Sequence, residues 1–215
     1  MAKKIHIHPN QANLFSSEQL YPITELEATR ASALACTACA LAGGRTQVVF
    51  GSGKEDRPDI MFIGEAPGVN EDAKGRPFSG QAGEILRKLL KQIGYDFQDV
   101  YLANIVMCRP PNNKKPEMAE IAACASYLVR QIRIVKPRVI CLLGQTAAEA
   151  TFHKTFKGID GVRNVWYQWD KTPVRCSFHP SILLPKRQPF RMEEALDDLK
   201  AVRAKVEQVK LRAHA

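Results

Sequence analysis

The chain has 215 residues, of which 45% are hydrophobic and 25% charged, and this composition excludes a disordered or fibrous chain. Its 31 Lys and Arg exceed its 22 Asp and Glu, and the formal charge of +9 favours polyanions such as nucleic acid as partners. No apolar run approaches the roughly 20 residues that span a bilayer, and the start "MAKKIHIHPNQANLF" has no apolar signal core. We therefore expect a cytoplasmic protein without a membrane partner, whose cysteines are thiols or metal ligands rather than disulfides.

The beginning of the chain divides into an arm and a helix. Residues 1–25 are polar with isolated apolar positions, which predicts an N-terminal arm, and residues 26–215 are expected to form one domain. An Ala- and Leu-rich stretch from Glu25 to Leu41 predicts a helix that leads into Cys36 and Cys39.

Strand and helix patterns alternate through the rest of the chain. Short apolar runs bounded by turn residues predict buried strands at residues 59–64, 100–106, 138–144, 162–169 and 172–180. Apolar stripes with spacings of three and four predict helices over residues 85–93, 121–132 and 195–206, and a short helix is expected in "GQTAAEATF". This alternation predicts an α/β sandwich with a mainly parallel sheet.

A glycine-rich loop, "GEAPGVNEDAKGRPFSGQAG" (64–83), follows the first apolar strand. Open α/β sheets bind ligands at the carboxyl ends of their strands, where glycines let backbone N–H groups come close to a ligand. The neighbouring "GSGKE" is not a phosphate-binding P-loop, because Val48 replaces the first glycine and Glu55 replaces the Ser or Thr. The loop also lacks the G-x-G-x-x-G spacing of dinucleotide sites. It offers instead a carboxylate, Glu65, and an aromatic ring, Phe78, which suit chemistry on a planar heterocycle.

Two further polar residues follow later strands. Asn104 ends the second predicted strand and His179 ends a later one, so both should meet Glu65 at one edge of the sheet. An Asn amide donates and accepts at once, as reading the edge of uracil requires, and a histidine can donate to developing negative charge. The structural alternatives are a core anchor for Phe78, a loop cap for Glu65 and a turn residue for His179.

Four segments resemble successive motifs of the family 4 uracil-DNA glycosylases, the iron–sulfur branch of that superfamily. They are "GEAPG", "GRPFSGQAG", "NIVMCRPPNNKKP" and "HPSILL", and the likeness extends from about Ala35 to Lys205. The resemblance implies a three-layer α/β/α sandwich around a four-stranded, mainly parallel sheet. It also implies a DNA repair hydrolase that flips uracil out of DNA and hydrolyses its N-glycosidic bond, releasing free uracil and leaving an abasic site.

The resemblance also implies a role for each matching residue. Phe78 would stack on the flipped base, Asn104 would bond its polar edge and His179 would stabilise the uracil anion at O2. Glu65 would position or activate the attacking water, and Glu71 would hinder the methyl group of thymine. Catalysis is thus expected from Glu65, Asn104 and His179, and substrate binding from Ala66, Gly68, Glu71, Phe78, Asn104 and His179.

A DNA-binding set is expected around the same edge, with apolar residues that fill the vacated base stack and cations that contact phosphates. Its members are Ser79, Gly80, Ser181, Leu183, Leu184, Lys186 and Arg187. The family usually has Arg after the paired leucines, whereas this chain has Pro185, which alters the wedge and its phosphate contact.

Six cysteines fall into two groups. By spacing alone, Cys36, Cys39, Cys108 and Cys124 suit a four-thiolate zinc site as well as an iron–sulfur cluster. The resemblance implies a 4Fe–4S cluster, because these four positions match the family's ligands. Cys141 and Cys176 lie inside predicted strands and are expected to be small buried hydrophobes.

Other functions stay open at this point. A DNA-binding module with a structural zinc would explain the charge and the cysteines, and a differently specific member of the fold would act on another deaminated base such as hypoxanthine. "QANLF" (Gln11–Phe15) resembles the Q-x-x-L-F peptide that docks bacterial repair proteins on the sliding clamp, and the alternative is an arm that packs on the domain. We expect a monomer that binds uracil-containing DNA.

Overall fold

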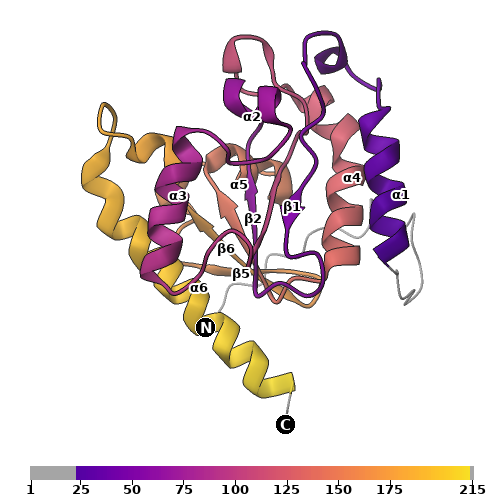
Figure 1. Ribbon diagram of the computed structural model, residues 1–215. Helices are drawn as coiled ribbons and strands as arrows, with labels where there is room; N and C mark the ends of the chain where they lie inside the picture. The colour runs from indigo at the N-terminus through magenta and orange to yellow at the C-terminus, as the bar shows by residue number, and fades with distance from the viewer. Residues whose placement is uncertain (1–22, 214–215) are drawn as a thin grey trace.

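The computed structural model describes residues 23–213 as an α/β sandwich (Figure 1). The stretch Gln11–Phe15, with its resemblance to a clamp-binding peptide, lies outside the described residues. The first helix begins at Ile23, so residues 23–25, which we predicted to belong to the arm, are helical. Over the described range, no helix combines the length and the apolar character needed to cross a membrane.

One mixed sheet of six strands forms the middle layer, in the order β1-β3-β2-β4-β6-β5. The strands are β1 (Ser52–Gly53), β2 (Ile60–Gly64), β3 (Tyr101–Asn104), β4 (Val139–Leu143), β5 (Trp166–Trp169) and β6 (Thr172–Ser177). The four central strands β3, β2, β4 and β6 are parallel, whereas β1 and β5 pair antiparallel at the edges. The predicted parallel core is confirmed, but the expected total of four strands is wrong. An edge strand of two residues, such as β1, is too short to leave a pattern in the sequence. The strand β5 was predicted, but its sequence does not show that it pairs with β6 as a hairpin at the edge of the same sheet.

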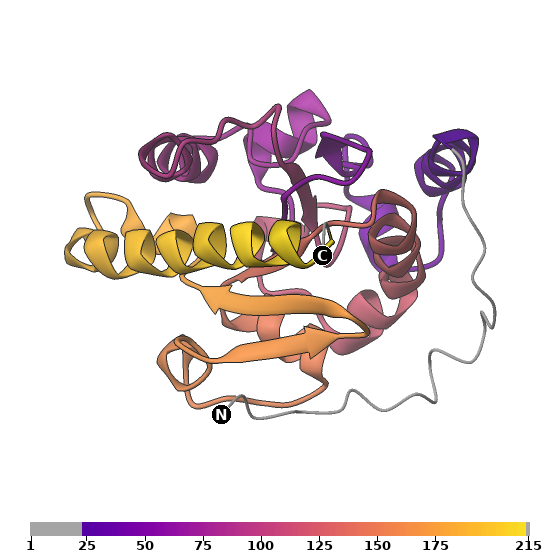
Figure 2. The same cartoon turned by 90° about the horizontal axis from the view of Figure 1, so that it is seen from below.

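Helices cover both faces of the sheet, which confirms the three layers (Figure 2). On one face lie α1 (Ile23–Leu34), α4 (Met118–Val135) and α5 (Gln145–Phe152), and on the other lie α3 (Gln81–Gln92) and α6 (Met192–Ala213). A short helix, α2 (Val69–Lys74), interrupts the glycine-rich loop that follows β2. Single 3-10 turns occur at η2 (Ala40–Gly43), η3 (Pro111–Asn113), η4 (Ile159–Gly161), η5 (Pro180–Leu183) and η6 (Pro189–Arg191).

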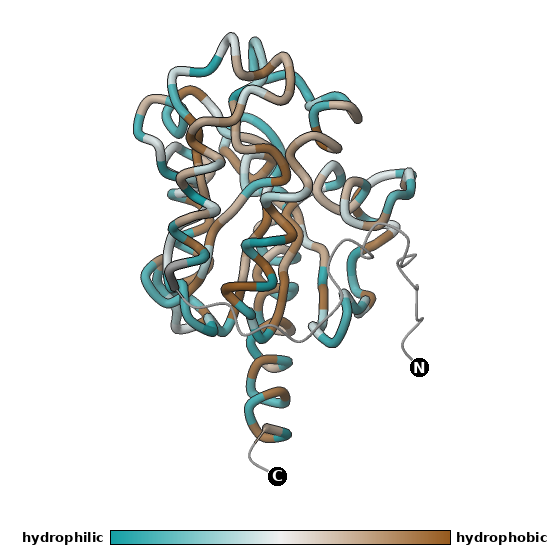
Figure 3. Tube along the Cα trace, turned by 90° about the vertical axis from the view of Figure 1, so that its right-hand side faces the viewer, coloured by the Kyte–Doolittle hydropathy of each residue, from teal (hydrophilic) through white to brown (hydrophobic). Residues whose placement is uncertain are grey.

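The strand sequences explain why both faces are covered. Every residue of β2 is buried, with Met61 and Ile63 in the core beneath α4 and Ile60 and Phe62 in the core beneath α3 and α6. Figure 3 shows the hydrophobic strands enclosed by helices of mixed hydropathy. Burial of each large apolar side chain contributes about 1.5–3 kcal/mol, so this doubly covered sheet is the stable platform for the loops at its edges.

The predicted helical stripes are confirmed. In α3 the buried positions include Leu86, Leu89 and Leu90, and in α6 they include Leu199 and Val202. Both helices pack against the same core, and the last turns of α6 project beyond the body of the molecule (Figures 1 and 3).

Candidate active site

The carboxyl ends of three parallel strands bring the predicted residues to one edge of the sheet. Gly64 ends β2 and lies in register with Asn104, the last residue of β3. The chain leaves β6 at Ser177 and reaches His179 two residues later. Glu65 follows Gly64 directly, is half-buried, and accepts a hydrogen bond at its backbone carbonyl from the N–H of Val106 (3.3 Å).

Three side chains converge on Gly64 at the centre of this edge. A Cβ atom on Gly64 would lie 2.5 Å from Oδ1 of Asn104, 2.8 Å from Cζ of Phe78 and 3.6 Å from Nε2 of His179. The Phe78 and His179 rings have centroids 6.2 Å apart and are tilted by 32°. An amide, an aromatic ring and an imidazole therefore gather around Gly64, and they come this close only because residue 64 has no side chain.

The Nε2 atom of His179 lies beside Gly64 and carries the hydrogen of the ring. Its Nδ1 accepts a hydrogen bond from the backbone N–H of Ser181 (3.3 Å) and lies 2.8 Å from the Ser181 hydroxyl oxygen. Burial, assisted by the nearby cation of Arg187, lowers the pKa of His179 to about 4. The ring is therefore neutral near pH 7, and since Nδ1 accepts, the hydrogen is on Nε2, which offers a donor beside Gly64.

Two other polar side chains at this edge lack a protein partner. Asn104 is only 4% exposed, yet its amide forms no hydrogen bond with any other residue in the range 23–213. The Glu65 carboxylate likewise pairs with no residue of that range. The fully buried side-chain atoms without a partner in residues 23–213 are Nε of Arg30, Arg175 and Arg191, so the polar atoms of Asn104 reach solvent at this edge, where a ligand can replace that solvent as their partner.

The position of Phe78 depends on unusual backbone. Phe78 is 5% exposed and adopts a left-handed conformation with φ of 54°, which costs a non-glycine residue about 1–3 kcal/mol. Its backbone packs against Gly83, where a Cβ would lie 1.7 Å from the Phe78 carbonyl oxygen. Strain of this kind persists where the fold holds a side chain in place for a purpose.

Glu71 holds the glycine-rich loop together. One carboxylate oxygen accepts from the N–H of Gly68 (3.1 Å) and the other from the N–H of Gly80 (2.8 Å), which is the N-cap of α3. The neighbouring Asp72, 3% exposed, accepts from the backbone N–H of Thr46 (2.9 Å). The family resemblance implies a role toward substrate for Glu71, whereas the Asp72 contact was not predicted; the available signal for it is the pair of acids in the first turn of α2.

Several residues expected to bind substrate or DNA make contacts near their own loops. Ala66 packs against the core, and Gly68 is tied to Glu71. The backbone carbonyl of Ser79 accepts a hydrogen bond from the Lys74 ammonium (3.2 Å), and the Ser181 hydroxyl is hydrogen-bonded to Nδ1 of His179.

The two leucines in the segment after His179 differ in their exposure to solvent. Leu183 is 1% exposed and belongs to the core, whereas Leu184 is half-buried at the surface, so Leu184 is the one that solvent reaches. Pro185, Lys186 and Arg187 are exposed.

Phe190, 74% exposed, follows them in the chain, and the sequence analysis did not identify it as a candidate. A large exposed aromatic beside cations is typical of a nucleic-acid surface.

A buried ionic network supports β6 just before His179. Asp198 of α6 accepts from Arg163 (2.7 Å) and Arg175 (3.0 Å), and the Ser177 hydroxyl donates to the same carboxylate (2.9 Å). Asp198 is 1% exposed, and Arg163 lies over the ring of Phe178, 3.9 Å from its centroid. The sequence feature that could have predicted this network is an acidic residue, Asp198, on the apolar face of α6.

The four expected ligand cysteines share one neighbourhood: Cys36 follows α1, Cys39 precedes η2, Cys108 lies in the loop after β3, and Cys124 lies within α4. Burial raises the pKa of the Cys124 thiol to about 12, and Cys108, Cys39 and Cys36 each add to that rise, which places the four within electrostatic reach of one another. Arg45 donates to Sγ of Cys108 (3.2 Å) and to the Cys36 carbonyl (2.7 Å). Within residues 23–213, no group of three or more His, Cys, Asp or Glu side chains is arranged as a formed metal site. Cys141 and Cys176 are fully buried in strands, as predicted.

Comparison with known proteins agrees with this geometry. The family model described as "Uracil DNA glycosylase superfamily" matches residues 50–200. The type-4 uracil-DNA glycosylase of Thermotoga maritima is 42% identical over 170 residues, 79% of this chain and 88% of that protein. The type-4 uracil-DNA glycosylase of Sulfurisphaera tokodaii is 41% identical over 74% of this chain and 76% of that protein. The one of Archaeoglobus fulgidus is 39% identical over 79% of this chain and 87% of that protein. The chain therefore belongs to the uracil-DNA glycosylase superfamily and, within it, to the type-4 family.

Proposed function

We propose that this protein is a uracil-DNA glycosylase, which hydrolyses the N-glycosidic bond of deoxyuridine in DNA. The observation that carries the proposal is the convergence beside Gly64 of Phe78, the unpaired Asn104 amide and the Nε2 donor of His179. A planar pyrimidine matches these groups, with one face on the ring and its polar edge on the amide. The relatives named above carry this activity in their names.

The reaction separates charge, which explains why the site has a hydrogen-bond donor at one end and a carboxylate at the other. As the bond between N1 and C1′ breaks, positive charge grows on the sugar and negative charge on the base. The Nε2–H of His179 donates to the oxygen where the negative charge collects, and the Glu65 carboxylate faces the positive sugar and orients the water. The water oxygen bonds to C1′, its released proton passes to Glu65 or solvent, and the uracil anion leaves and is protonated by solvent. The products are free uracil and an abasic site.

Substrate selection uses the loop after β2. Glu71, fixed between the Gly68 and Gly80 amides, keeps the loop closed beside the base, so the methyl group of thymine has no room to enter. Flipping costs a few kcal/mol, which contacts in the pocket and insertion of Leu184 offset, while Lys186 and Arg187 contact phosphates.

The proposed cofactor is a 4Fe–4S cluster held by Cys36, Cys39, Cys108 and Cys124. The donor set fits, since it consists of four thiols without carboxylates, and Arg45 already donates to the Cys108 sulfur. Such a cluster supplies iron–thiolate bonds that link the end of α1 to α4 and to the loop after β3, and takes no part in the hydrolysis. Iron and acid-labile sulfide in equal amounts, with visible absorbance that bleaches on oxidation, would support it, whereas stoichiometric zinc in a colourless protein would refute it.

Excision is tested with an end-labelled oligonucleotide that carries one uracil, followed by alkali, beside matched thymine and hypoxanthine oligonucleotides. We expect cleavage at uracil and none at thymine; cleavage at hypoxanthine alone would assign a different base. Glu65→Gln should lower the single-turnover rate by about 100- to 1,000-fold with DNA affinity retained. Glu84→Gln, an exposed acid in the first turn of α3, is the matched control and should keep the wild-type rate. Equal loss in both variants would contradict the role of Glu65.

A further inference from the structure

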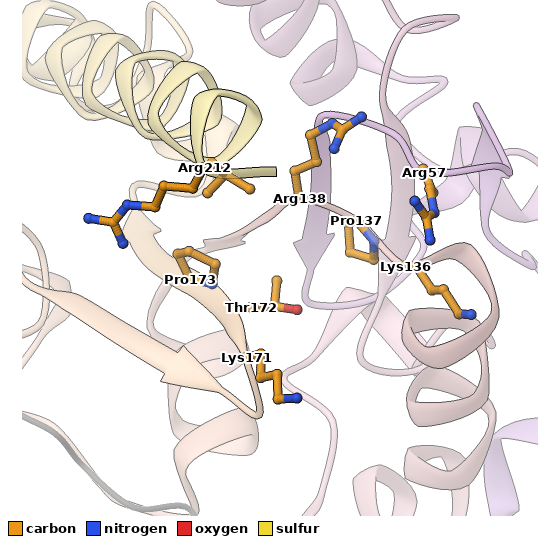
Figure 4. A pocket seen from close by; sticks show the side chains of 9 residues that line it. Arg57, Lys136, Pro137, Arg138, Lys171, Thr172, Pro173 and Arg212 are labelled. Atoms are coloured by element: carbon orange, nitrogen blue, oxygen red, sulfur yellow. The ribbon is translucent and has the colours of Figure 1, made fainter. Parts of the chain in front are cut away.

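A basic cavity of about 400 Å³ lies at the edge of the sheet opposite the candidate active site (Figure 4). Its lining comes from the loop before β2, the junction of α4 and β4, the turn between β5 and β6, and the end of α6. It contains five cationic side chains and no acidic one: Arg57, Lys136, Arg138, Lys171 and Arg212.

The cavity and the active site are separate places. The cavity adjoins the amino ends of β4 and β6, whereas Gly64 and Asn104 lie at the carboxyl ends of their strands. The five residues of β2, at about 3.3 Å each, place the two edges about 16 Å apart. A DNA base held above Gly64 therefore does not reach the cavity.

Some of these cations have roles in the fold. Arg138 bonds Asp59 (3.1 Å), which also accepts from Tyr95 (2.9 Å). Lys136 caps the carboxyl end of α4 and Arg212 lies in the last turn of α6, where positive charge stabilises a helix.

Arg57 and Lys171 have no such role. Both are exposed loop residues, and neither forms an ion pair with any acid of the described range, although Asp56 and Asp170 adjoin them in the chain. Folding has thus placed two cations without an acidic partner beside three others, which creates a local positive potential that attracts an anion.

The shape of the cavity indicates what kind of anion binds. Pro137, Pro173 and Val209 supply apolar walls, which strengthen the local positive potential, and Thr172 adds a hydroxyl donor. Figure 4 shows Arg212 on one side of the cavity and Arg57 and Lys136 on the other. The cations thus border an extended path, as a chain of phosphates requires, rather than converging on one point as a single phosphate does.

We propose that this cavity is a second DNA-binding site, which contacts the phosphodiester backbone of a DNA segment other than the one in the active site. Two such sites on opposite edges of the sheet let one molecule hold two DNA segments. The inference rests on the cavity and its charges and does not depend on which base the active site takes.

The test uses the full chain, an undamaged fluorescent 30-base-pair duplex and anisotropy titrations over a range of salt concentrations. The pocket variant is Arg57→Gln combined with Lys171→Gln. The control variant, Lys88→Gln combined with Lys200→Gln, removes the same charge from positions halfway along α3 and α6. Thermal denaturation of both variants checks that the fold is intact.

The proposal predicts that the pocket variant weakens duplex binding about tenfold at low salt and lowers the slope of log K against log salt by about two, since each phosphate contact contributes about 0.9. The control variant should keep the wild-type slope. Equal slopes for all three proteins would overturn the proposal. Saturable binding of inorganic phosphate that Arg57→Gln abolishes, with an unchanged DNA slope, would assign the cavity to small phosphates and overturn it as well. Because undamaged DNA is used, a failure here leaves the excision assay unaffected.

Discussion

Two buried polar clusters lie close to His179 and differ in one respect. Around Asp198, the carboxylate is paired with the guanidinium groups of Arg163 and Arg175. Beside Gly64, Asn104 is buried to a similar degree, but its amide reaches solvent and pairs with no described residue. The paired carboxylate stabilises the fold, whereas the unpaired amide can take a ligand as its partner, so the partners of these two groups distinguish a structural from a functional role.

The largest effect should come from breaking the paired cluster. Asp198→Asn leaves Arg175 as a buried cation without an acidic partner, while Arg163 keeps Glu194 and Asp160, and we expect a loss of about 3–5 kcal/mol in the free energy of unfolding. Urea denaturation followed by circular dichroism measures it. The comparison fails if Asp198→Asn unfolds like the wild type, because Asp198 would then not be the stabilising partner.

The next effect should come from adding a side chain at residue 64. Gly64→Ala puts a Cβ within 2.5 Å of Oδ1 of Asn104, so the amide and the Phe78 ring must move, and excision should fall about 100-fold. Gly161→Ala is the matched control, because nothing lies within 4 Å of its added Cβ. Single-turnover rates on uracil-containing DNA measure both. A Gly64→Ala enzyme of wild-type rate would show that excision does not depend on the positions of Asn104 and Phe78 beside Gly64.

A smaller effect concerns pH. The pKa of His179 falls from its ordinary value of 6.5 to about 4 on folding, so between these values the unfolded chain binds a proton that the folded protein does not. The contribution of His179 should therefore make the protein less stable as the pH falls from about 6.5 to about 4, with no change above 6.5. Nitrogen NMR of the ring should show a neutral imidazole at pH 6, and an imidazolium at that pH would contradict the Nε2 donor.

Much of the fold could be predicted from sequence because its signals are local. The buried strands β2, β3 and β4 are short apolar runs, and the stripe of α6 repeats at helical spacing. The edge strand β1 has two residues, Ser52 and Gly53, which carry no β signal and pair only because β3 lies beside them.

The location of the candidate site could be predicted, but the contacts that hold its residues could not. Asn104 and His179 could be placed at one edge because parallel strands end together, and Phe78 because its loop follows the first of those strands, while the roles of all three stay predictions. The bond from Ser181 to His179 and the left-handed backbone of Phe78 depend on loop geometry that spacing does not encode. Pairing between distant residues, such as Arg163 with Asp198, is likewise a property of tertiary packing.

The most direct test combines two measurements on Asn104→Ala, with Asn113→Ala in an exposed turn as the control. Because the Asn104 amide has no protein partner among the described residues, its removal should leave the melting temperature unchanged or raised, while uracil excision falls at least about 100-fold. A fall in melting temperature with excision preserved at temperatures where the variant is folded would contradict it, because the amide would then serve the fold and not the base.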